Sequence, residues 1–179
     1  GISAEMIADR WDLSREELDE FGAQSQQRAL RARDEGRFDN EIIPVKAMPR
    51  DKETGDLIAS DEIVKADEGI REGTTAESLA KLKPAFKEDG KVTAGNSSAI
   101  VDGAAAMLVT SEAAAGRLRL EPRGRFVSFG IAGVDPYRML HGNPLACERA
   151  LARAGLTWDD IRDKHPEIFR DAKLREHFH

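Results

Sequence analysis

The spacing of apolar residues after Ser14 predicts a long helix. Ser14 and Glu17 fit a capping box, in which a serine and a glutamate three positions later satisfy each other's backbone N–H groups. Gly36 is typical of the left-handed residue just beyond a helix C-terminus. We therefore expect a helix from Ser14 toward Gly36. Its apolar residues recur near one face at Leu18, Phe21, Ala29 and Ala32.

The remainder of the first half is predicted to be mostly helix and exposed loop. Residues 41–47 form its one clear extended segment. Thr74 and Glu77 repeat the capping-box pattern ahead of a shorter helix. Between these elements, residues 48–73 are rich in charged and turn-forming side chains, which predicts an exposed excursion with a short hairpin near Gly55.

The second half alternates in the manner of a layered α/β core. Residues 104–110 are apolar and continuous enough for a buried strand or a helix, and periodicity does not decide between them. Residues 125–132 are a better strand candidate, because Phe and Val are enriched there. Residues 143–154 predict a helix that ends at Gly155.

The last part of the chain is predicted to be helical and charged. Thr157 and Asp160 have the spacing of a helix cap. Residues 162–179 then read as a short charged helix, with Pro166 accommodated in its first turn.

Composition narrows the possible partners. The 27 basic and 33 acidic residues give a net charge of −6, which argues against broad attraction to nucleic acid but permits a local basic patch. No apolar run reaches the roughly 18 residues of a membrane span, and no signal-peptide pattern is present. The single cysteine excludes an internal disulfide, which fits a cytoplasmic location.

Residues 92–98, with the sequence VTAGNSS, form the most informative segment. Gly95 tolerates positive φ, and Asn96 tolerates the left-handed region better than most residues. Ala94 and Ser98 carry little bulk, so a thin ligand can lie along this backbone. The simpler alternative is an ordinary loop that leads into the apolar residues 104–109.

Five further motifs keep their order along the chain with this loop. They are SREELDEF at 14–21, GRFDNEIIPV at 36–45, LAKLKPAF at 79–86, GVDP at 133–136 and ALARAGL at 150–156. Together the six segments resemble the thiolases, which make and break carbon–carbon bonds between acyl groups carried as coenzyme A (CoA) thioesters.

The resemblance implies an α/β fold: part of a thiolase-like layered α/β core with an α-rich loop domain. Residues 1–86 would be the loop domain that covers CoA, and residues 87–161 would be part of the core. Residues 162–179 depart from the family pattern and would form a divergent helical tail. Thiolases are generally dimers or tetramers, so we expect a homo-oligomer or a partner chain that completes the fold.

The resemblance also implies five contacts with CoA or acyl-CoA. Arg71 would pack against the adenine end, Ser78 would lie near the nucleotide half, and Phe86 would line the channel. Ala94 and Ser98 would contact the pantetheine arm. The alternatives are a solvated loop arginine, a serine on an exposed helix face and a core phenylalanine.

No catalytic residue is predicted. Thiolase chemistry needs a thiolate nucleophile and a base that generates it. Cys147 lies in a predicted helix where the family has a small residue, so we interpret it as an inert thiol. None of the four histidines matches the family's catalytic motif, and His177 and His179, without further spaced ligands, predict no metal site.

Two functions remain open at this level. The chain resembles an acyl-CoA C-acyltransferase and supplies CoA-binding elements without the catalytic Cys and His motifs, so that alone it is predicted to be inactive. The alternative is a non-catalytic CoA-binding or scaffold subunit of a thiolase-like assembly. The length and charge of residues 48–73 also permit a protein contact unrelated to CoA.

Overall fold

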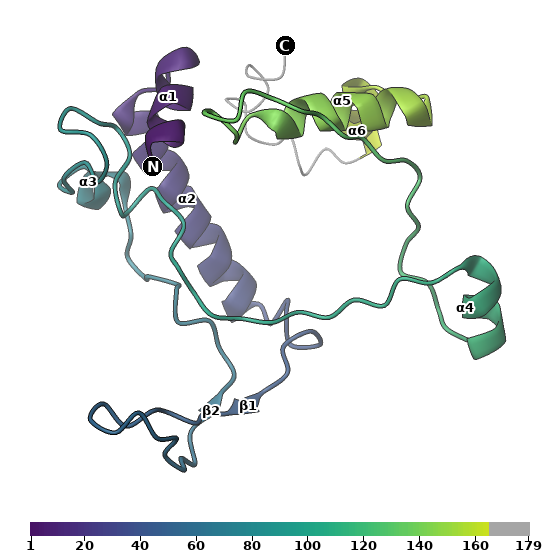
Figure 1. The fold of residues 1–179 in the computed structure, drawn as a ribbon, viewed down its shortest axis with the longest axis horizontal. Coiled ribbons are helices and arrows are strands. Elements are labelled where there is room, and N and C mark those ends of the chain that lie inside the picture. Colours follow the sequence, from purple (N-terminus) through teal and green to yellow (C-terminus); the bar gives the residue numbers. More distant parts are fainter. Residues whose placement is uncertain (165–179) are drawn as a thin grey trace. The chain divides into compact units, whose positions relative to one another are not determined.

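The computed structural model describes residues 1–164 and divides the chain into two compact units (Figure 1). The N-terminal unit, Gly1–Asp102, contains α1 (Ile2–Arg10), α2 (Arg15–Asp34), β1 (Val45–Lys46), β2 (Ile63–Val64) and α3 (Ala76–Leu79). The C-terminal unit, Gly103–His179, contains α4 (Glu112–Leu118), α5 (Gly142–Ala154) and α6 (Trp158–Lys164). We describe each unit by itself.

Helix α2 is the main element of the N-terminal unit, and its ends agree with the prediction. Ser14 Oγ accepts a hydrogen bond from the Glu17 N–H at 3.1 Å, and Glu17 Oε2 accepts one from the Ser14 N–H at 2.8 Å. Gly36 follows the C-cap residue Glu35 with φ of +64°. The capping box and the left-handed glycine predicted from sequence are therefore confirmed.

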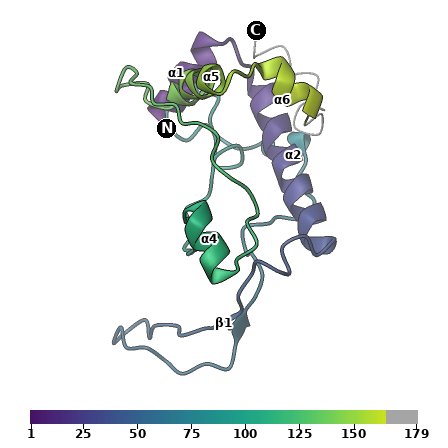
Figure 2. The same cartoon turned by 90° about the vertical axis from the view of Figure 1, so that its right-hand side faces the viewer.

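The exposed excursion is a hairpin arm that projects away from α1 and α2 (Figure 2). Strands β1 and β2 pair antiparallel, with Val45 opposite Val64. Nearer the tip, Arg50 and Leu57 form an isolated bridge, and Gly55 turns the chain with φ of +75°. The hairpin prediction is confirmed, although the extended segment shortens to two residues on each strand.

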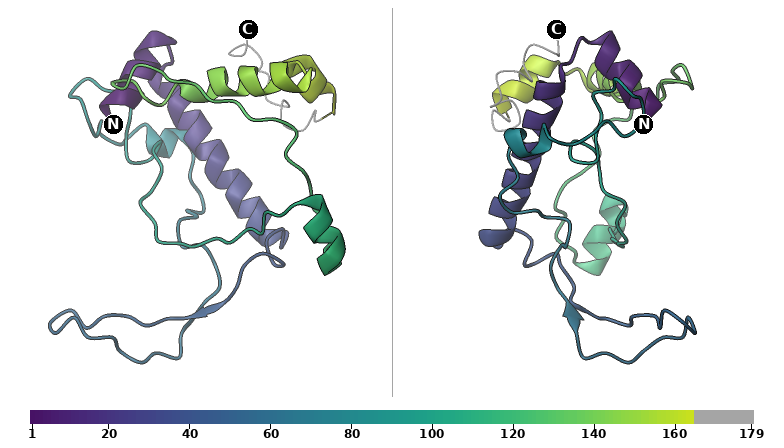
Figure 3. Two further views of the ribbon diagram at one scale, coloured as in Figure 1. Left: turned by 45° about the vertical axis from the view of Figure 1, so that its right-hand side comes forward. Right: turned by 90° about the vertical axis from the view of Figure 1, so that its left-hand side faces the viewer.

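Helix α3 is a single turn beside α2 (Figure 3), and its cap corrects the prediction by one residue. Thr75, rather than Thr74, is the N-cap: its Oγ1 accepts from the Ser78 N–H at 3.2 Å. The Thr74 hydroxyl instead donates to the Arg71 carbonyl. Leu79, at the end of α3, is buried.

The small interior of the N-terminal unit is half polar. Glu5 and Asp19 are 2% and 1% exposed, and Thr93 is fully buried. Because a buried charged group is costly unless it is hydrogen-bonded, these side chains must be held by specific partners. The apolar residues buried with them are Ala8, Ala23, Leu79 and Val92.

In the C-terminal unit the predicted helices form and the predicted strands do not. Helix α5 ends at Gly155, which has φ of +68°, and α6 is capped by Thr157, whose N–H donates to Asp160 Oδ2 at 2.7 Å; both predictions are confirmed. Helix α4 was not predicted, although Ser111, whose Oγ accepts from the Ala114 N–H, is a typical N-cap.

Residues 104–110 are irregular and exposed, so the prediction of a buried strand or helix is wrong. Residues 125–132 are also not a strand, although side chains of α5 hold them: Arg149 and Arg153 donate to the carbonyls of Ile131 and Phe129. A strand needs a neighbour to take its backbone hydrogen bonds, and no described segment pairs with either stretch.

The predicted tail lies mostly outside the described residues, since only 162–164, the end of α6, are described. No helix within residues 1–164 is long and apolar enough to cross a membrane.

Candidate functional site

A pocket of about 310 Å³ lies in the N-terminal unit between α2, the loop at 67–70 and the predicted ligand loop. Helix α2 contributes residues between Phe21 and Ala29 to the lining, and the ligand loop contributes Gly95 to Ser98. The backbone of the VTAGNSS loop is thus an edge of the pocket, as its small residues led us to expect. The lining residues are Phe21, Gly22, Ser25, Gln26, Ala29, Asp67, Gly69, Ile70, Gly95–Ala99 and Val101.

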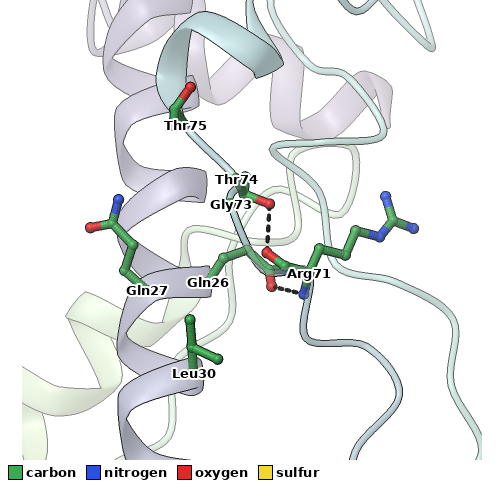
Figure 4. A pocket seen from close by; sticks show the side chains of 7 residues that line it. All are labelled: Gln26, Gln27, Leu30, Arg71, Gly73, Thr74 and Thr75. Carbon is green, nitrogen blue, oxygen red and sulfur yellow. Dashed lines mark hydrogen bonds between the residues drawn. The ribbon is translucent and has the colours of Figure 1, made fainter.

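A second cavity, of about 160 Å³ (Figure 4), has Gln26 in its lining, as the larger pocket also does. Gln26 Oε1 accepts a hydrogen bond from the Arg71 N–H at 2.8 Å, so α2 fixes the backbone of the loop before α3. The Arg71 side chain points away from α2 in Figure 4. The cavity is lined by Gln26, Gln27, Leu30, Arg71, Gly73, Thr74 and Thr75.

Two glycines allow the ligand loop to pack closely, Gly22 against α2 and Gly95 against the side chains at and after the end of α3. A Cβ at Gly22 would stand 3.1 Å from the Gly95 carbonyl oxygen and 3.3 Å from the Asn96 Cα. A Cβ at Gly95 would stand 2.5 Å from a methyl of Leu82 and 2.6 Å from a methyl of Leu79. A side chain at Gly22 would therefore push the loop away from α2, and one at Gly95 would displace Leu79 and Leu82.

A buried polar network fixes the shape of the loop. Asn96 donates from Nδ2 to Asp19 Oδ1 at 2.9 Å and to the Lys91 carbonyl at 3.0 Å. Asn96 Oδ1 accepts from the Thr93 N–H at 2.8 Å. Thr93 Oγ1 in turn accepts from the N–H groups of Gly95 and Asn96.

Helix α1 holds the start of the loop. The two carboxylate oxygens of Glu5 accept from the N–H groups of Lys91 and Val92, each at 2.9 Å. The Lys91 ammonium lies 3.2 Å from Asp9. Its hydrogen bond, with the charge of Lys87, holds the pKa of the Asp9 carboxyl below its ordinary value. Two consecutive N–H groups on one buried carboxylate make this junction rigid.

The structure places two of the five predicted contacts on the cavities. Arg71 lines the smaller cavity, and Ser98 lines the larger pocket. Within residues 1–164 the Arg71 guanidinium has no hydrogen-bonding or ion-pair partner, and the adjacent Glu72 pairs with Arg33 instead, at 2.6 Å. A charged group is thus available to a ligand on the side of the loop that faces away from α2.

The other three predicted contacts lie apart from these cavities. Ala94 is exposed and precedes the lining residues. The Ser78 hydroxyl belongs to the cap of α3, since it accepts from the Thr75 N–H and donates to the Thr75 carbonyl. The Phe86 ring packs beside the N-terminal residue Gly1, where an added Cβ would stand 2.2 Å from the ring.

The described residues contain no obvious catalytic pair. Cys147 is exposed on α5, and His141 is the N-cap of that helix. The remaining histidines, at 165, 177 and 179, lie outside the described residues. Within residues 1–164 no group of three or more His, Cys, Asp or Glu side chains is placed to hold a metal ion.

Sequence reasoning missed Glu5, Asp19 and Gln26, which shape the site. Arg15 and Asp19 have the helical i,i+4 spacing of an ion pair, which makes a solvated helix face the obvious interpretation. Burial and contact with residues more than 70 positions away give Asp19 its role.

The family model described as "Thiolase, N-terminal domain" matches residues 1–113, well over half of the chain. The chain belongs to the thiolase family. This confirms the resemblance seen in the sequence motifs. A probable acetyl-CoA acyltransferase of Staphylococcus aureus (strain COL) is 48% identical over 161 residues, which are 90% of this chain and 39% of that protein. An acetyl-CoA acetyltransferase of Shinella zoogloeoides is 47% identical over the same shares.

Solved thiolase structures agree with this fold. The acetyl-CoA acetyltransferase of Bacillus anthracis matches with a TM-score of 0.78 and 37% identity, over 88% of this chain and 38% of that one. Human mitochondrial 3-ketoacyl-CoA thiolase, solved in complex with CoA, matches with a TM-score of 0.78 and 39% identity, over 88% of this chain and 37% of that one. The α/β thiolase fold class is thereby confirmed, and the chain spans about two fifths of the relatives that it matches.

Proposed function

We propose that this thiolase chain supplies the CoA-binding elements of an acyl-CoA C-acyltransferase and binds the CoA thioester along α2 and the 92–98 loop. Within this proposal, residues 1–86 form the loop domain that covers the cofactor and residues 87–161 contribute to the core. The relatives named acyl- and acetyltransferases, and the human thiolase solved with CoA, support this class of ligand.

The observation that carries the proposal is that two cavities beside α2 share the lining residue Gln26. Arg71 stands at one cavity and Ser98 at the other. CoA has a charged nucleotide end and a thin pantetheine arm. An exposed guanidinium suits phosphate and adenine, because it carries a permanent charge and stacks on aromatic rings. A hydroxyl among small residues suits the amides of pantetheine.

The roles of the other predicted contacts are proposed more narrowly. Ala94 and Phe86 would meet CoA only beyond the two cavities, and Ser78 would do so only if a ligand replaced part of its cap hydrogen bonding. We therefore place the binding energy chiefly on Arg71 and Ser98.

Acyl transfer itself would need groups that residues 1–164 do not pair. A thiolase nucleophile is a thiolate beside a base. Cys147, the one cysteine, is exposed on α5 in the other unit. This observation also favours a second candidate function, a non-catalytic CoA-binding or scaffold subunit of a thiolase-like assembly. Such a subunit would use the same CoA site and would need no catalytic residues.

Calorimetric titration of the full chain with CoA and with ADP tests the proposal. We expect saturable CoA binding that weakens about tenfold in Arg71→Ala, since a charge-assisted contact is typically about 1.5–3 kcal/mol and 1.4 kcal/mol is tenfold. Ser98→Ala should weaken CoA binding by about threefold or more, because a neutral hydrogen bond contributes about 0.5–1.5 kcal/mol.

ADP separates the two ends of the ligand, because it carries the adenosine diphosphate of CoA without the 3′-phosphate and without the pantetheine arm. Arg71→Ala should weaken ADP binding and Ser98→Ala should leave it unchanged. Arg117→Ala, which removes an exposed arginine from α4, controls for the lost charge. A folded wild-type chain that binds neither ligand, or equal losses in Arg71→Ala and Arg117→Ala, would refute the proposed site.

A further inference from the structure

The side chain that orients the ligand loop does not itself face the pocket. Asp19 is 1% exposed and is not among the pocket-lining residues, whereas Asn96, its partner, lines the pocket. The bond between them joins residues 77 positions apart. Asp19 is therefore placed to act on a ligand through Asn96 rather than by contact.

Chemistry permits only one orientation of the Asn96 amide. Its Nδ2 faces the Asp19 carboxylate and the Lys91 carbonyl, both of which only accept hydrogen bonds. Its Oδ1 faces the Thr93 N–H, which only donates. A flipped amide would set oxygen against two oxygens and NH₂ against an N–H. The buried charge of Asp19 thus selects the amide orientation that closes the loop.

Closure of the loop determines where the pocket wall stands. The Asn96 side chain joins the Lys91 carbonyl to the Thr93 N–H, and the Thr93 hydroxyl accepts hydrogen bonds from the N–H groups of Gly95 and Asn96. With residues 91–96 fixed in this way, the backbone enters Ser97 and Ser98 from a defined point beside Gly22.

Asp19 makes two sets of contacts: the first arm is the hydrogen bond from Asn96 to Oδ1, and the second arm is made through Oδ2. A test must separate the two arms. Asp19 Oδ2 accepts from Arg15 Nε at 2.7 Å. Arg15 Nη2 donates to the carbonyls of Leu79 and Leu82 at 2.9 and 3.0 Å, so this arm secures the end of α3. The first arm shapes the ligand loop, and the second stabilises the fold around it.

We propose that Asp19 is a positioning residue, which sets the affinity for the CoA thioester by holding Asn96 in the one orientation that closes the 92–98 loop. The inference rests on the proposed function and deepens it. It assigns a determinant of affinity to a buried carboxylate that never touches the ligand.

A reciprocal exchange of the two side chains tests the first arm. In Asp19→Asn, one oxygen must serve two donors, so one arm opens. In Asn96→Asp, two carboxylates face each other. In the double variant, the new amide at 19 donates to the new carboxylate at 96, which still accepts from the Thr93 N–H. The bond to the Lys91 carbonyl is lost, and a carboxylate oxygen faces that carbonyl in its place. Such a cycle isolates the coupling of the pair.

Two readouts on the full chain are needed. We expect each single exchange to weaken CoA binding about tenfold, the scale of a lost charge-assisted hydrogen bond, and the double exchange to recover part of that loss. Hydrogen exchange at the Thr93 amide, measured without CoA, should quicken in both single variants and slow again in the double variant.

Two controls separate positioning from general stability. Ala32→Gly lowers the helix propensity of α2 away from the loop, and Arg15→Met removes the α3 arm alone. Both should lower thermal stability with less than threefold change in CoA affinity. If they weaken CoA binding as much as Asp19→Asn does at matched loss of stability, the role of Asp19 is only structural and the proposal is overturned.

The remaining outcomes also decide. Unchanged affinity and unchanged Thr93 exchange in Asp19→Asn, or a double variant worse than both single variants, would overturn the positioning role. A folded wild-type chain that binds no CoA overturns the proposed function, and with it the claim on affinity. The exchange data then still show whether Asp19 orders the loop, so the two failures are distinguishable.

Discussion

At the scale of single residues, Gly90 is required by the carboxylate that anchors the ligand loop. A Cβ at this position would stand 2.3 Å from Glu5 Oε1 and 2.9 Å from the Lys87 carbonyl oxygen. We expect Gly90→Ala to displace Glu5 from the Lys91 and Val92 N–H groups and to lower the free energy of unfolding by about 1–3 kcal/mol. Urea unfolding of the full chain measures this loss.

Gly103→Ala is the matched control for Gly90→Ala. A Cβ at Gly103 would meet no atom within 4 Å, and its φ is not in the left-handed region. This substitution should leave stability unchanged or raise it slightly, because alanine restricts the unfolded chain. Equal effects of the two substitutions would show that the Glu5 carboxylate does not require a glycine at 90.

Single-residue predictions from the sequence succeeded mostly where the relevant contact is local, although the cap of α3 lies at Thr75 and not at Thr74. The Ser14–Glu17 box and the glycines at 36 and 155 depend on neighbours within one helical turn. The buried pair of Asp19 and Asn96 depends on a fold that brings residues 77 positions apart together, so periodicity gave no signal for it.

At the scale of elements, the cap of α6 is expected to respond to pH. The Thr157 hydroxyl, and then the Thr157 N–H, hold the pKa of the exposed Asp160 carboxyl below the ordinary value of 3.8. Because the folded pKa is lower than the unfolded one, the cap contributes its full stability above about pH 4 and loses it as pH falls through the folded pKa.

A carbon-detected NMR titration of the Asp160 carboxyl measures this shift. The midpoint should lie below 3.8 in the native chain and move toward 3.8 in Thr157→Val, which keeps the N–H and removes the hydroxyl. The urea-unfolded chain supplies the reference. A native midpoint at or above that reference would contradict the cap as described.

Elements that need a distant partner were not predictable from the letters. Residues 125–132 have strand composition, yet within the described residues they contact α5 through side chains and pair with no strand. Residues 104–110 are apolar yet exposed, including Met107 at 80%. Composition indicates what a segment favours, while a sheet forms only where another strand supplies hydrogen bonds.

At the scale of the whole molecule, the proposed CoA cavities and the single cysteine belong to different units. The candidate ligand cavities are built entirely from the N-terminal unit, and Cys147 belongs to the C-terminal unit. Motif order was enough to predict the family, because six segments in sequence carry far more information than one. The contacts that shape the site, such as the bond between Asp19 and Asn96, could be found only from the structure.

We predict that the 179-residue chain binds CoA without catalysing acyl transfer. Thiolysis of acetoacetyl-CoA should not exceed the background rate, since the only cysteine is exposed on α5 and no histidine within residues 1–164 lies beside it.

A thiol-specific alkylating reagent should label Cys147 readily, because the side chain is accessible. Cys147→Ser should abolish labelling and leave CoA affinity unchanged. Turnover that disappears in Cys147→Ser would instead make this cysteine a nucleophile, and the chain would then be an enzyme in its own right rather than a binding part of one.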